Sequence, residues 1–342
     1  MVKIAINGFG RIGRVAFRAA LERYADKVEI VAINTSGSMD IKGWAHLLKY
    51  DTVYGRFDGE IGEIGGDEGE LGKLLIGGKV YPVLGQRDPE KLPWEKYGVD
   101  VVLESTGVFR NLKDCQAHLK AGAKKVIISA PAKDETPIYV LGVNADQYKG
   151  EKIISNASCT TNCIAPVAKI MKDNFNVVKA SMTTIHAYTA DQELVDGSHK
   201  DLRRARSATQ NIIPTTTGAA EAMAKVLPSF RGKFDGLAIR VPVACGSLAD
   251  FTFVLDKSVR VEKINQVFEA ASGDSRYQGI VAVTKDPIVS SDIIGNSASA
   301  IVDLGLTKVI DGNLVKIIAW YDNEWGYSCR LVEMANIISQ NE

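Results

Sequence analysis

Several features that would indicate a specialised environment are missing from this sequence. Lysine plus arginine and aspartate plus glutamate number 41 each, so no global basic field favours nucleic acid or an anionic membrane as a partner. No apolar run reaches the ~18 residues that a membrane-spanning helix needs, and the N-terminus lacks the apolar core of a signal peptide. The five cysteines match neither a disulfide framework nor a four-ligand zinc site. We therefore expect a cytoplasmic protein with no metal, nucleic-acid or membrane partner.

The first half of the chain alternates short apolar runs with helical stretches. Lys3–Asn7 is typical of a buried strand, residues 11–25 have helical periodicity, and residues 27–34 indicate a second strand. This order is a βαβ unit, which builds parallel sheets. A further helix is expected at Asn111–Ala123. We expect further strands at Val99–Thr106, Lys124–Ser129 and Tyr139–Asn144.

The pattern changes after about residue 155 to longer alternating runs, which favour a mixed or antiparallel sheet. Residues 261–272 predict a helix between these runs, and residues 327–340 predict an amphipathic helix that packs back on the first domain. The glycine- and acid-rich segment Gly59–Gly78 predicts a solvated hairpin or loop. The alternating runs are residues 177–189, 236–247, 249–257 and 313–323.

A glycine fingerprint, Gly8-x-Gly10-x-x-Gly13, follows the first strand and opens the first helix. That context is typical of dinucleotide binding, because the glycines allow a tight turn, close approach to a pyrophosphate and helix–strand packing. The helix N-terminus favours the anion. The predicted fold is α/β: a Rossmann doubly wound parallel sheet plus an α+β catalytic domain with a mixed or antiparallel sheet. We assign residues 1–158 and 323–342 to the dinucleotide-binding domain and 159–322 to the catalytic domain.

Cys159 is the candidate nucleophile, since it begins a helical run after small polar residues. The first turn of a helix stabilises a thiolate, so we expect a lowered pKa for Cys159. Cys163, one turn later, is interpreted as structural. His186 ends a strand and begins a polar loop, where a catalytic base commonly lies, whereas His118 and His199 are expected to face solvent.

A cysteine and a histidine fit two kinds of enzyme. One is a cysteine protease, which would leave the dinucleotide fingerprint without a role. The other is a thiol-dependent aldehyde oxidation on a nicotinamide cofactor, which the fingerprint favours.

Five segments together resemble one family through nearly the whole chain. They are "INGFGRIGR", "LLKYDTVYGRF", "SNASCTTNCIAP", "HKDLRRARSATQNIIPTTTGAA" and "WYDNEWGYS". In this order they are similar to phosphorylating glyceraldehyde-3-phosphate dehydrogenase. Ala244-Cys245-Gly246 replaces a more usual proline-containing stretch, and Cys245 is interpreted as a packing residue.

The resemblance implies roles for individual residues. Cys159 attacks the aldehyde to form a thiohemiacetal, and His186 takes the proton and steadies the oxyanion. Hydride passes to the nicotinamide, and inorganic phosphate releases 1,3-bisphosphoglycerate from the resulting thioester. By similarity, the substrate phosphate is bound by Thr189, Asp191, Arg204 and Arg240, and the attacking phosphate by Ser158, Thr160, Thr217 and Gly218. Asn323 holds the nicotinamide carboxamide, Tyr327 packs near its ring, and the rest of the dinucleotide is contacted by Arg11, Ile12, Arg87, Thr106 and Ser129.

The end of the second strand departs from the NAD-using members of that family. They carry aspartate after "VAIN", where its carboxylate binds the adenosine ribose and repels a 2′-phosphate. Here Thr35 stands at that position, and Ser36 and Ser38 follow with further hydroxyl groups. Ser198 replaces a common proline in a loop that, in a tetramer, reaches a neighbouring subunit's cofactor. We therefore expect NADP to be accepted well, with NADP preference or dual use of NADP and NAD.

Alternative functions stay open at this point. An erythrose-4-phosphate dehydrogenase shares the architecture, although "AYTADQ" keeps the Thr-x-Asp associated with the triose enzyme. A catalytically silent binding protein of the same fold is a second alternative. A homotetramer acting on glyceraldehyde 3-phosphate and inorganic phosphate is what the resemblance implies. NADP use suits carbon fixation or gluconeogenesis, and NAD use suits glycolysis.

Overall fold

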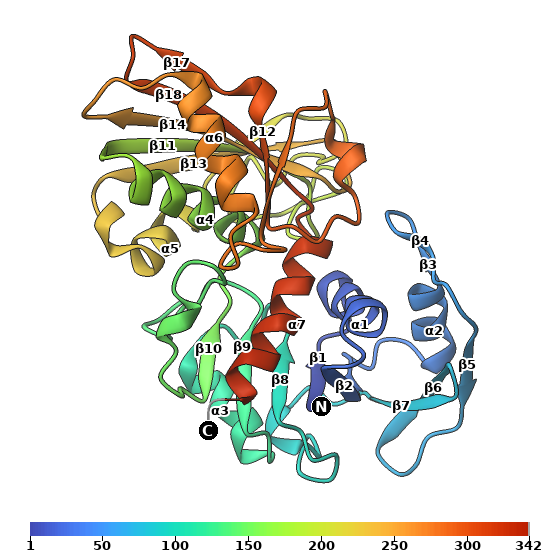
Figure 1. Ribbon diagram of the computed structural model, residues 1–342. Helices are drawn as coiled ribbons and strands as arrows, with labels where there is room; N and C mark the ends of the chain where they lie inside the picture. The colour runs from blue at the N-terminus through green and yellow to red at the C-terminus, as the bar shows by residue number, and fades with distance from the viewer. Residues whose placement is uncertain (341–342) are drawn as a thin grey trace. The chain divides into compact units, whose positions relative to one another are not determined.

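The computed structural model describes residues 1–340, which divide into two compact units (Figure 1). The first unit comprises Met1–Tyr139, Gln147–Ala157 and the described residues from Ser328 onward. The second unit comprises Val140–Asp146 and Ser158–Tyr327. Within the described part of the chain, no helix has the length and apolar character needed to cross a membrane.

The first unit contains an eight-stranded sheet with the order β10-β9-β8-β1-β2-β7-β6-β5. The pairs from β10 to β7 are parallel, and β6 and β5 add an antiparallel hairpin at one edge. Its helices are α1 (Arg11–Arg23), α2 (Ile41–Lys49), α3 (Leu112–Lys120) and, from Ser328, α7 (Trp325–Ser339). The strands are β1 (Val2–Asn7), β2 (Val28–Asn34), β3 (Tyr50–Asp51), β4 (Gly55–Arg56), β5 (Ile61–Ile64), β6 (Glu70–Ile76), β7 (Lys79–Leu84), β8 (Val101–Glu104), β9 (Lys125–Ile128) and β10 (Ile153–Ser155).

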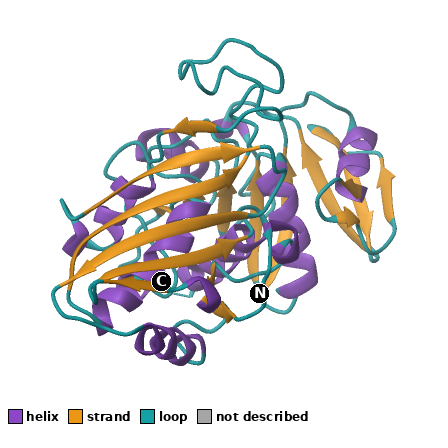
Figure 2. Ribbon diagram, turned by 90° about the horizontal axis from the view of Figure 1, so that it is seen from above, coloured by secondary structure: helices purple, strands orange, loops and turns teal. Residues whose placement is uncertain are grey.

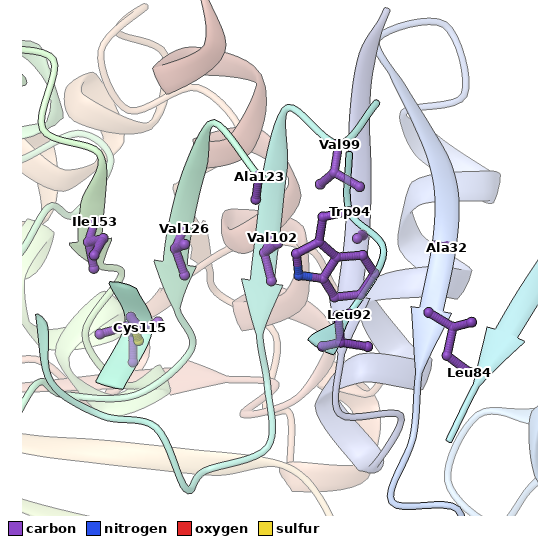
Figure 3. Packing of buried hydrophobic residues seen from close by; sticks show 12 residues of the cluster. Ala32, Leu84, Leu92, Trp94, Val99, Val102, Cys115, Ala123, Val126 and Ile153 are labelled. Atoms are coloured by element: carbon purple, nitrogen blue, oxygen red, sulfur yellow. The ribbon is translucent and has the colours of Figure 1, made fainter. Parts of the chain in front are cut away.

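Both faces of the parallel part of this sheet are covered. Ala5 of β1 belongs to the same buried cluster as Trp94 and Val102. Figure 3 shows Trp94 beside Val102 in this cluster. Successive strand residues point to opposite faces, and Ile6 accordingly lies beneath Gly13 of α1. Parallel strands buried on both faces have continuous apolar sequences, which explains why β8 is buried throughout.

The structure confirms most of the elements expected in the first half, and it corrects two points. The segment Tyr139–Asn144 forms turns, with a single bridge at Ile138, instead of the expected strand. His118 was expected to face solvent, but α3 turns it inward and its side chain is fully buried. Within Gly59–Gly78, β5 and β6 form the antiparallel hairpin.

The second unit is built on a mixed sheet with the order β12-β13-β11-β14-β18-β16-β15, with β17 paired to β18. Figure 2 shows long strands of a sheet lying side by side. Most pairs are antiparallel, but β11–β13 and β15–β16 are parallel. This confirms the predicted sheet type. Its helices are α4 (Cys159–Asn174), α5 (Ala219–Val226) and α6 (Val261–Ser272). Its strands are β11 (Val177–Ala187), β12 (Ile213–Thr215), β13 (Phe234–Val241), β14 (Ser247–Leu255), β15 (Val281–Thr284), β16 (Ala300–Asp303), β17 (Lys308–Ile310) and β18 (Leu314–Tyr321).

Helices cover one face of the second sheet. Helix α4 contacts β11, β14, β16 and β18, and α5 and α6 contact β13 and β15 (Figure 1). Along β14 every second residue is buried, from Ser247 to Leu255. This alternation indicates a sheet with one face in the core.

Candidate active site

Cys159 is the first residue of α4, and its side chain is half-buried. Ser158 caps the helix, because its hydroxyl accepts a hydrogen bond from the backbone N–H of Thr161 at 3.1 Å. Ala157 adopts a left-handed conformation with φ 57°, a strained geometry that non-glycine residues often adopt at functional sites. Cys163 is buried one turn later. The helix therefore presents one partly accessible thiol at its N-terminal turn.

His186 faces this thiol from the C-terminal end of strand β11. Its Nε2 lies 3.4 Å from Sγ of Cys159. Its Nδ1 lies 2.6 Å from the carbonyl oxygen of Ala187, and Arg240 Nη1 donates to the same carbonyl at 3.0 Å. The carbonyl oxygen can only accept and satisfies the tautomer with the proton on Nδ1, whereas Arg240 Nη1, a donor 2.7 Å from the same nitrogen, opposes it. That tautomer leaves Nε2 as a base directed at the thiol.

Burial and the charge of Arg240 set the protonation of this pair. Burial first, and then the charge of Arg240, whose Nη1 lies 2.7 Å from Nδ1, lower the pKa of His186 to about 3. Burial also raises the pKa of Cys159, although Arg240 and hydrogen bonds to Thr160 oppose that rise. The expected lowering of the Cys159 pKa is therefore wrong, because desolvation outweighs the helix terminus. The resting pair is a thiol beside an uncharged imidazole.

Two arginines, Arg204 and Arg240, are among the residues expected to bind the substrate phosphate. Arg204 pairs with Asp191 and donates from Nε to the hydroxyl of Thr215 at 2.9 Å. Arg240 is half-buried, and its buried Nε has no hydrogen-bond partner among residues 1–340. A buried guanidinium nitrogen without an acceptor fits an anion. Thr189 is half-buried and lies two residues after Ala187, the last residue of β11. The strand end therefore carries His186, and the loop after it carries groups that can donate hydrogen bonds to an anion.

At the site expected for the attacking phosphate, the residues differ in the hydrogen bonds that their side chains already make within the protein. The hydroxyl of Thr217 accepts from the N–H of Ala219 at 3.2 Å, and Gly218 is the N-cap of α5 without a side-chain cap. Thr160 is buried, and its hydroxyl lies 3.0 Å from Tyr321 Oη. Thr160 thus offers its backbone to an anion, while its hydroxyl belongs to a buried network with Tyr321.

Asn323 is held in one orientation by two residues that the sequence analysis did not identify. Its Oδ1 accepts from the N–H of Gly246 at 3.1 Å and from the hydroxyl of Ser247 at 2.8 Å. Ser247 in turn accepts from the N–H of Ala187 at 3.1 Å. The amide nitrogen of Asn323 is thereby directed as a donor, which suits a carboxamide oxygen. Ser247 is a polar residue on the buried face of an alternating strand, and that pattern was the available signal.

Two further buried residues lie close to Asn323. Tyr327 follows it in the chain, and Cys245 contacts its neighbour Asp322. Tyr327 lies in the first turn of α7, and the thiol of Cys245 donates to Asp322 at 3.2 Å. The packing role expected for Cys245 is confirmed by its burial.

The glycine fingerprint has the local geometry that a dinucleotide requires. Gly8 has φ +98°, and a Cβ there would lie 2.6 Å from the backbone of Ser105 and Thr106. A Cβ at Gly13 would lie 2.0 Å from the carbonyl oxygen of Gly8, so α1 packs closely on its own turn. A Cβ at Gly10 would meet nothing within 4 Å, and no side chain caps α1. The open N-terminus fits a pyrophosphate group.

A cavity of about 500 Å³ lies beside this turn, within the first unit. Arg11 does not line it; its guanidinium pairs with Asp51 at 2.6 Å, which leaves its backbone at the helix start. Ile12, Gly13 and Ser129 also lie outside the lining, and Ser198, Asn323 and Tyr327 belong to the second unit. The predicted residues that line the cavity are Gly8, Gly10, Thr35, Ser36, Arg87 and Thr106.

The structure corrects the role expected for the Thr35 hydroxyl. Thr35 is buried; its hydroxyl donates to the carbonyl of Leu84 at 3.0 Å and accepts from the N–H of Gly37 at 3.1 Å. Ser36 remains exposed, and Nε of the exposed Arg87 donates to its carbonyl at 3.3 Å. The hydroxyl of Thr35 thus shapes the turn, and the exposed groups near it are Ser36, Ser38 and Arg87.

Known proteins match this chain along nearly its whole length. The family profile described as the glyceraldehyde 3-phosphate dehydrogenase NAD binding domain matches residues 2–112, and that of the C-terminal domain matches residues 158–323. A curated glyceraldehyde-3-phosphate dehydrogenase from Streptomyces coelicolor is 52% identical over 335 residues, 97% of each chain. That of Geobacillus stearothermophilus is 50% identical over 340 residues, 99% of this chain and 98% of the relative. That of Mycobacterium tuberculosis is 51% identical over 344 residues, 99% of each.

Proposed function

The chain belongs to the glyceraldehyde 3-phosphate dehydrogenase family, and from this premise we propose that it converts glyceraldehyde 3-phosphate and inorganic phosphate into 1,3-bisphosphoglycerate, reversibly. The observation that carries the proposal is the 3.4 Å contact between Sγ of Cys159 and Nε2 of His186. A buried imidazole with a free Nε2 is suited to take the thiol proton as the sulfur attacks an aldehyde.

The residues of this pair account for the bonds that form and break. Sγ of Cys159 bonds to the aldehyde carbon, and the thiol proton moves to Nε2 of His186, which then donates to the oxyanion. A bound nicotinamide dinucleotide would supply the hydride acceptor, and Nε2 of His186 takes the hydroxyl proton back as the adduct becomes a thioester. Phosphate then attacks the thioester carbonyl, and Cys159 leaves as a thiolate. Arg240 holds the 3-phosphate beside the histidine, where its charge counteracts that of the substrate.

We propose that the adenosine end of the pocket accepts NADP at least as well as NAD. No carboxylate stands at the end of β2, and the next acid in the sequence, Asp40, caps α2 by accepting from the N–H of Gly43 at 2.9 Å. Ser36, Ser38 and Arg87 are exposed beside the turn, and these hydroxyl and guanidinium groups suit a 2′-phosphate. Ser198 of a neighbouring subunit adds a further hydroxyl in the proposed tetramer.

We propose a homotetramer because one loop of the second unit exposes several large apolar side chains. Clustered exposed apolar residues mark interaction surfaces. The loop between β11 and β12 contains Ser198, and its exposed apolar residues are Leu194, Val195, Leu202 and Ile212, each at least 69% exposed.

Steady-state kinetics test the reaction and the cofactor together. The purified protein is assayed with NAD⁺ and NADP⁺, each with glyceraldehyde 3-phosphate and with erythrose 4-phosphate. We expect phosphate-dependent oxidation of the triose and comparable or higher kcat/KM with NADP⁺. An NAD⁺ advantage of about a hundredfold, which corresponds to ~2.7 kcal/mol, would contradict the cofactor proposal. Retained dehydrogenase activity after stoichiometric alkylation of Cys159 by iodoacetate would contradict the thioester mechanism.

A further inference from the structure

Three neighbouring strands of the first sheet end in buried polar side chains that the proposed mechanism does not use. Asn7 ends β1, Asn34 ends β2 and Glu104 ends β8. The strand register places Asn7 opposite both of the others. All three side chains are buried. Ligands of open α/β sheets bind at the carboxyl ends of such strands, so these groups lie at the floor of the dinucleotide pocket.

Hydrogen bonds from four donor groups converge on the carboxyl group of Glu104. Its Oε2 accepts from Asn7 Nδ2 at 2.6 Å and from His118 Nε2 at 3.0 Å. Its Oε1 accepts from the backbone N–H of Thr106 at 2.9 Å and from the hydroxyl of Thr106. Only an ionised carboxylate accepts at all of these positions. Glu104 is therefore a buried anion that is stabilised by neutral donors.

The direction of each donor is determined by a further partner. The indole N–H of Trp94 can only donate, and it donates to His118 Nδ1 at 3.0 Å, so the imidazole is uncharged with its proton on Nε2. Asn34 Nδ2 donates to Asn7 Oδ1 at 2.7 Å, which turns the amide nitrogen of Asn7 toward Glu104. Figure 3 shows Trp94 packed among Leu92, Val99 and Val102, which restrict its orientation. With these proton positions the bonds to Glu104 and to Asn7 Oδ1 are all satisfied, and Asn7 Nδ2 and His118 Nε2, 3.5 Å apart, both face Oε2 of Glu104 as donors.

The same carboxylate holds the wall on which the glycine turn rests. Thr106, Asn7 and Asn34 line the cavity. Gly8 approaches the backbone of Ser105 and Thr106 so closely that a Cβ would lie 2.6 Å away. Because Oε1 of Glu104 binds both the N–H and the hydroxyl of Thr106, a change at Glu104 moves the surface beneath Gly8. The pyrophosphate turn depends on that surface.

We propose that Glu104, oriented by His118 and Trp94, is a positioning residue for dinucleotide binding: it holds the Ser105–Thr106 wall and the Asn7 amide in the geometry that the glycine turn requires. This inference rests on the proposed function, because it assigns the network to the same cofactor pocket. The network acts on binding of the dinucleotide and leaves the Cys159–His186 pair of the second unit unchanged.

A pair of substitutions at His118 separates positioning from simple loss of a buried side chain. His118→Leu removes the donor to Glu104 and leaves the Trp94 N–H without an acceptor. His118→Gln restores both, since an amide donates from nitrogen and accepts at oxygen. By isothermal titration calorimetry with NAD⁺ and NADP⁺, we expect the leucine variant to bind about tenfold more weakly and the glutamine variant within about threefold of wild type.

Glu104→Gln is the second probe, so that unfolding of one variant leaves the proposal testable. Its amide nitrogen would face the donors of Asn7 and His118, and we expect the same weakening, with KM for the dinucleotide raised and kcat at saturation within about threefold. Tyr139→Phe is the control, because it also removes one side-chain hydrogen bond, the partly buried one to Glu151, in the first unit but outside the cavity lining. It should lower the melting temperature without changing dinucleotide affinity.

The outcomes distinguish this inference from the proposed function. If wild type binds neither dinucleotide, the proposed function fails. If wild type binds and the His118→Leu and Glu104→Gln variants bind within about twofold of it despite lower melting temperatures, the network is only structural and the inference is overturned. Equal weakening in His118→Leu and His118→Gln also overturns it, because hydrogen-bond polarity is then irrelevant. Alkylation of Cys159 at the wild-type rate confirms in each variant that the second unit is intact.

Discussion

At the scale of single residues, the charge of Arg240 controls the chemistry of the Cys159–His186 pair. Burial raises the pKa of Cys159 and Arg240 opposes that rise. Arg240→Leu removes the opposing charge, so the thiolate fraction at neutral pH falls. We expect alkylation of Cys159 by the uncharged reagent iodoacetamide to slow about tenfold at pH ~7.5.

The control for this prediction is Arg204→Leu. Arg204 lowers the pKa of His186 but is not among the groups that shift the pKa of Cys159, so alkylation should keep the wild-type rate.

The pKa of His186 is about 3, so the imidazole stays uncharged above about pH 5. The wild-type alkylation rate should therefore rise with pH in a single step. A second inflection between pH ~5 and ~8 would show that the imidazole ionises there.

Thr35 is the residue at which cofactor choice is tested most directly. Its hydroxyl joins the carbonyl of Leu84 to the N–H of Gly37. Thr35→Asp places a carboxylate beside the adenosine ribose, where it repels a 2′-phosphate. We expect KM for NADP⁺ to rise about tenfold or more, at least ~1.4 kcal/mol, and KM for NAD⁺ to change less. Thr35→Ser keeps the hydroxyl and should leave the ratio of the two kcat/KM values unchanged.

At the scale of elements, the turn from β1 into α1 separates the packing role of glycine from its binding role. A Cβ at Gly13 would lie 2.0 Å from the Gly8 carbonyl, whereas a Cβ at Gly10 would meet nothing. We expect Gly13→Ala to destabilise the protein by about 1–3 kcal/mol. Gly10→Ala should keep the wild-type melting temperature but weaken dinucleotide binding, because its Cβ occupies the approach of the pyrophosphate. Melting curves and calorimetric titrations measure the two effects separately.

The elements that carry the site were predictable because each has a local sequence signal. The period-two runs of β11 and β14 and the glycine turn before α1 are decided by residues close in sequence, and the structure confirms them. Tyr139–Asn144 has the composition of a strand, but it forms turns and only Ile138 makes a bridge to the sheet. Apolar content alone does not distinguish a strand from a buried turn.

The errors within the site come from contacts that sequence spacing does not reveal. His118 lies in a charged helix, yet its partners Trp94 and Glu104 come from other segments and make burial favourable. The pKa of Cys159 depends on how far the surrounding protein removes the thiol from water, and a position in the first turn of a helix does not indicate that. The hydroxyl of Thr35 donates a hydrogen bond to the carbonyl oxygen of Leu84, which is 49 residues away in sequence. The pairing of Cys159 with His186, by contrast, followed from residue type and position at element ends.

At the scale of the whole molecule, the loop between β11 and β12 connects assembly to cofactor choice. It exposes Leu202 at 81% and Leu194 at 69%, and it carries the exposed Ser198. In the proposed tetramer, Ser198 acts on the cofactor of a neighbouring subunit. NADP use should then depend on assembly, whereas the thiol chemistry of Cys159 depends only on one chain.

Leu202→Asp tests this dependence, because a charge buried without a partner in an interface is costly. We expect multi-angle light scattering to show a smaller species, and the ratio of kcat/KM for NADP⁺ to that for NAD⁺ to fall about threefold to tenfold. Alkylation of Cys159 should keep its rate, since its surroundings lie within the second unit. Val80→Asp introduces the same charge at a 47% exposed apolar position in the first unit and should leave the assembly intact. A dissociated Leu202→Asp protein with the wild-type cofactor ratio would refute the role of Ser198 across subunits.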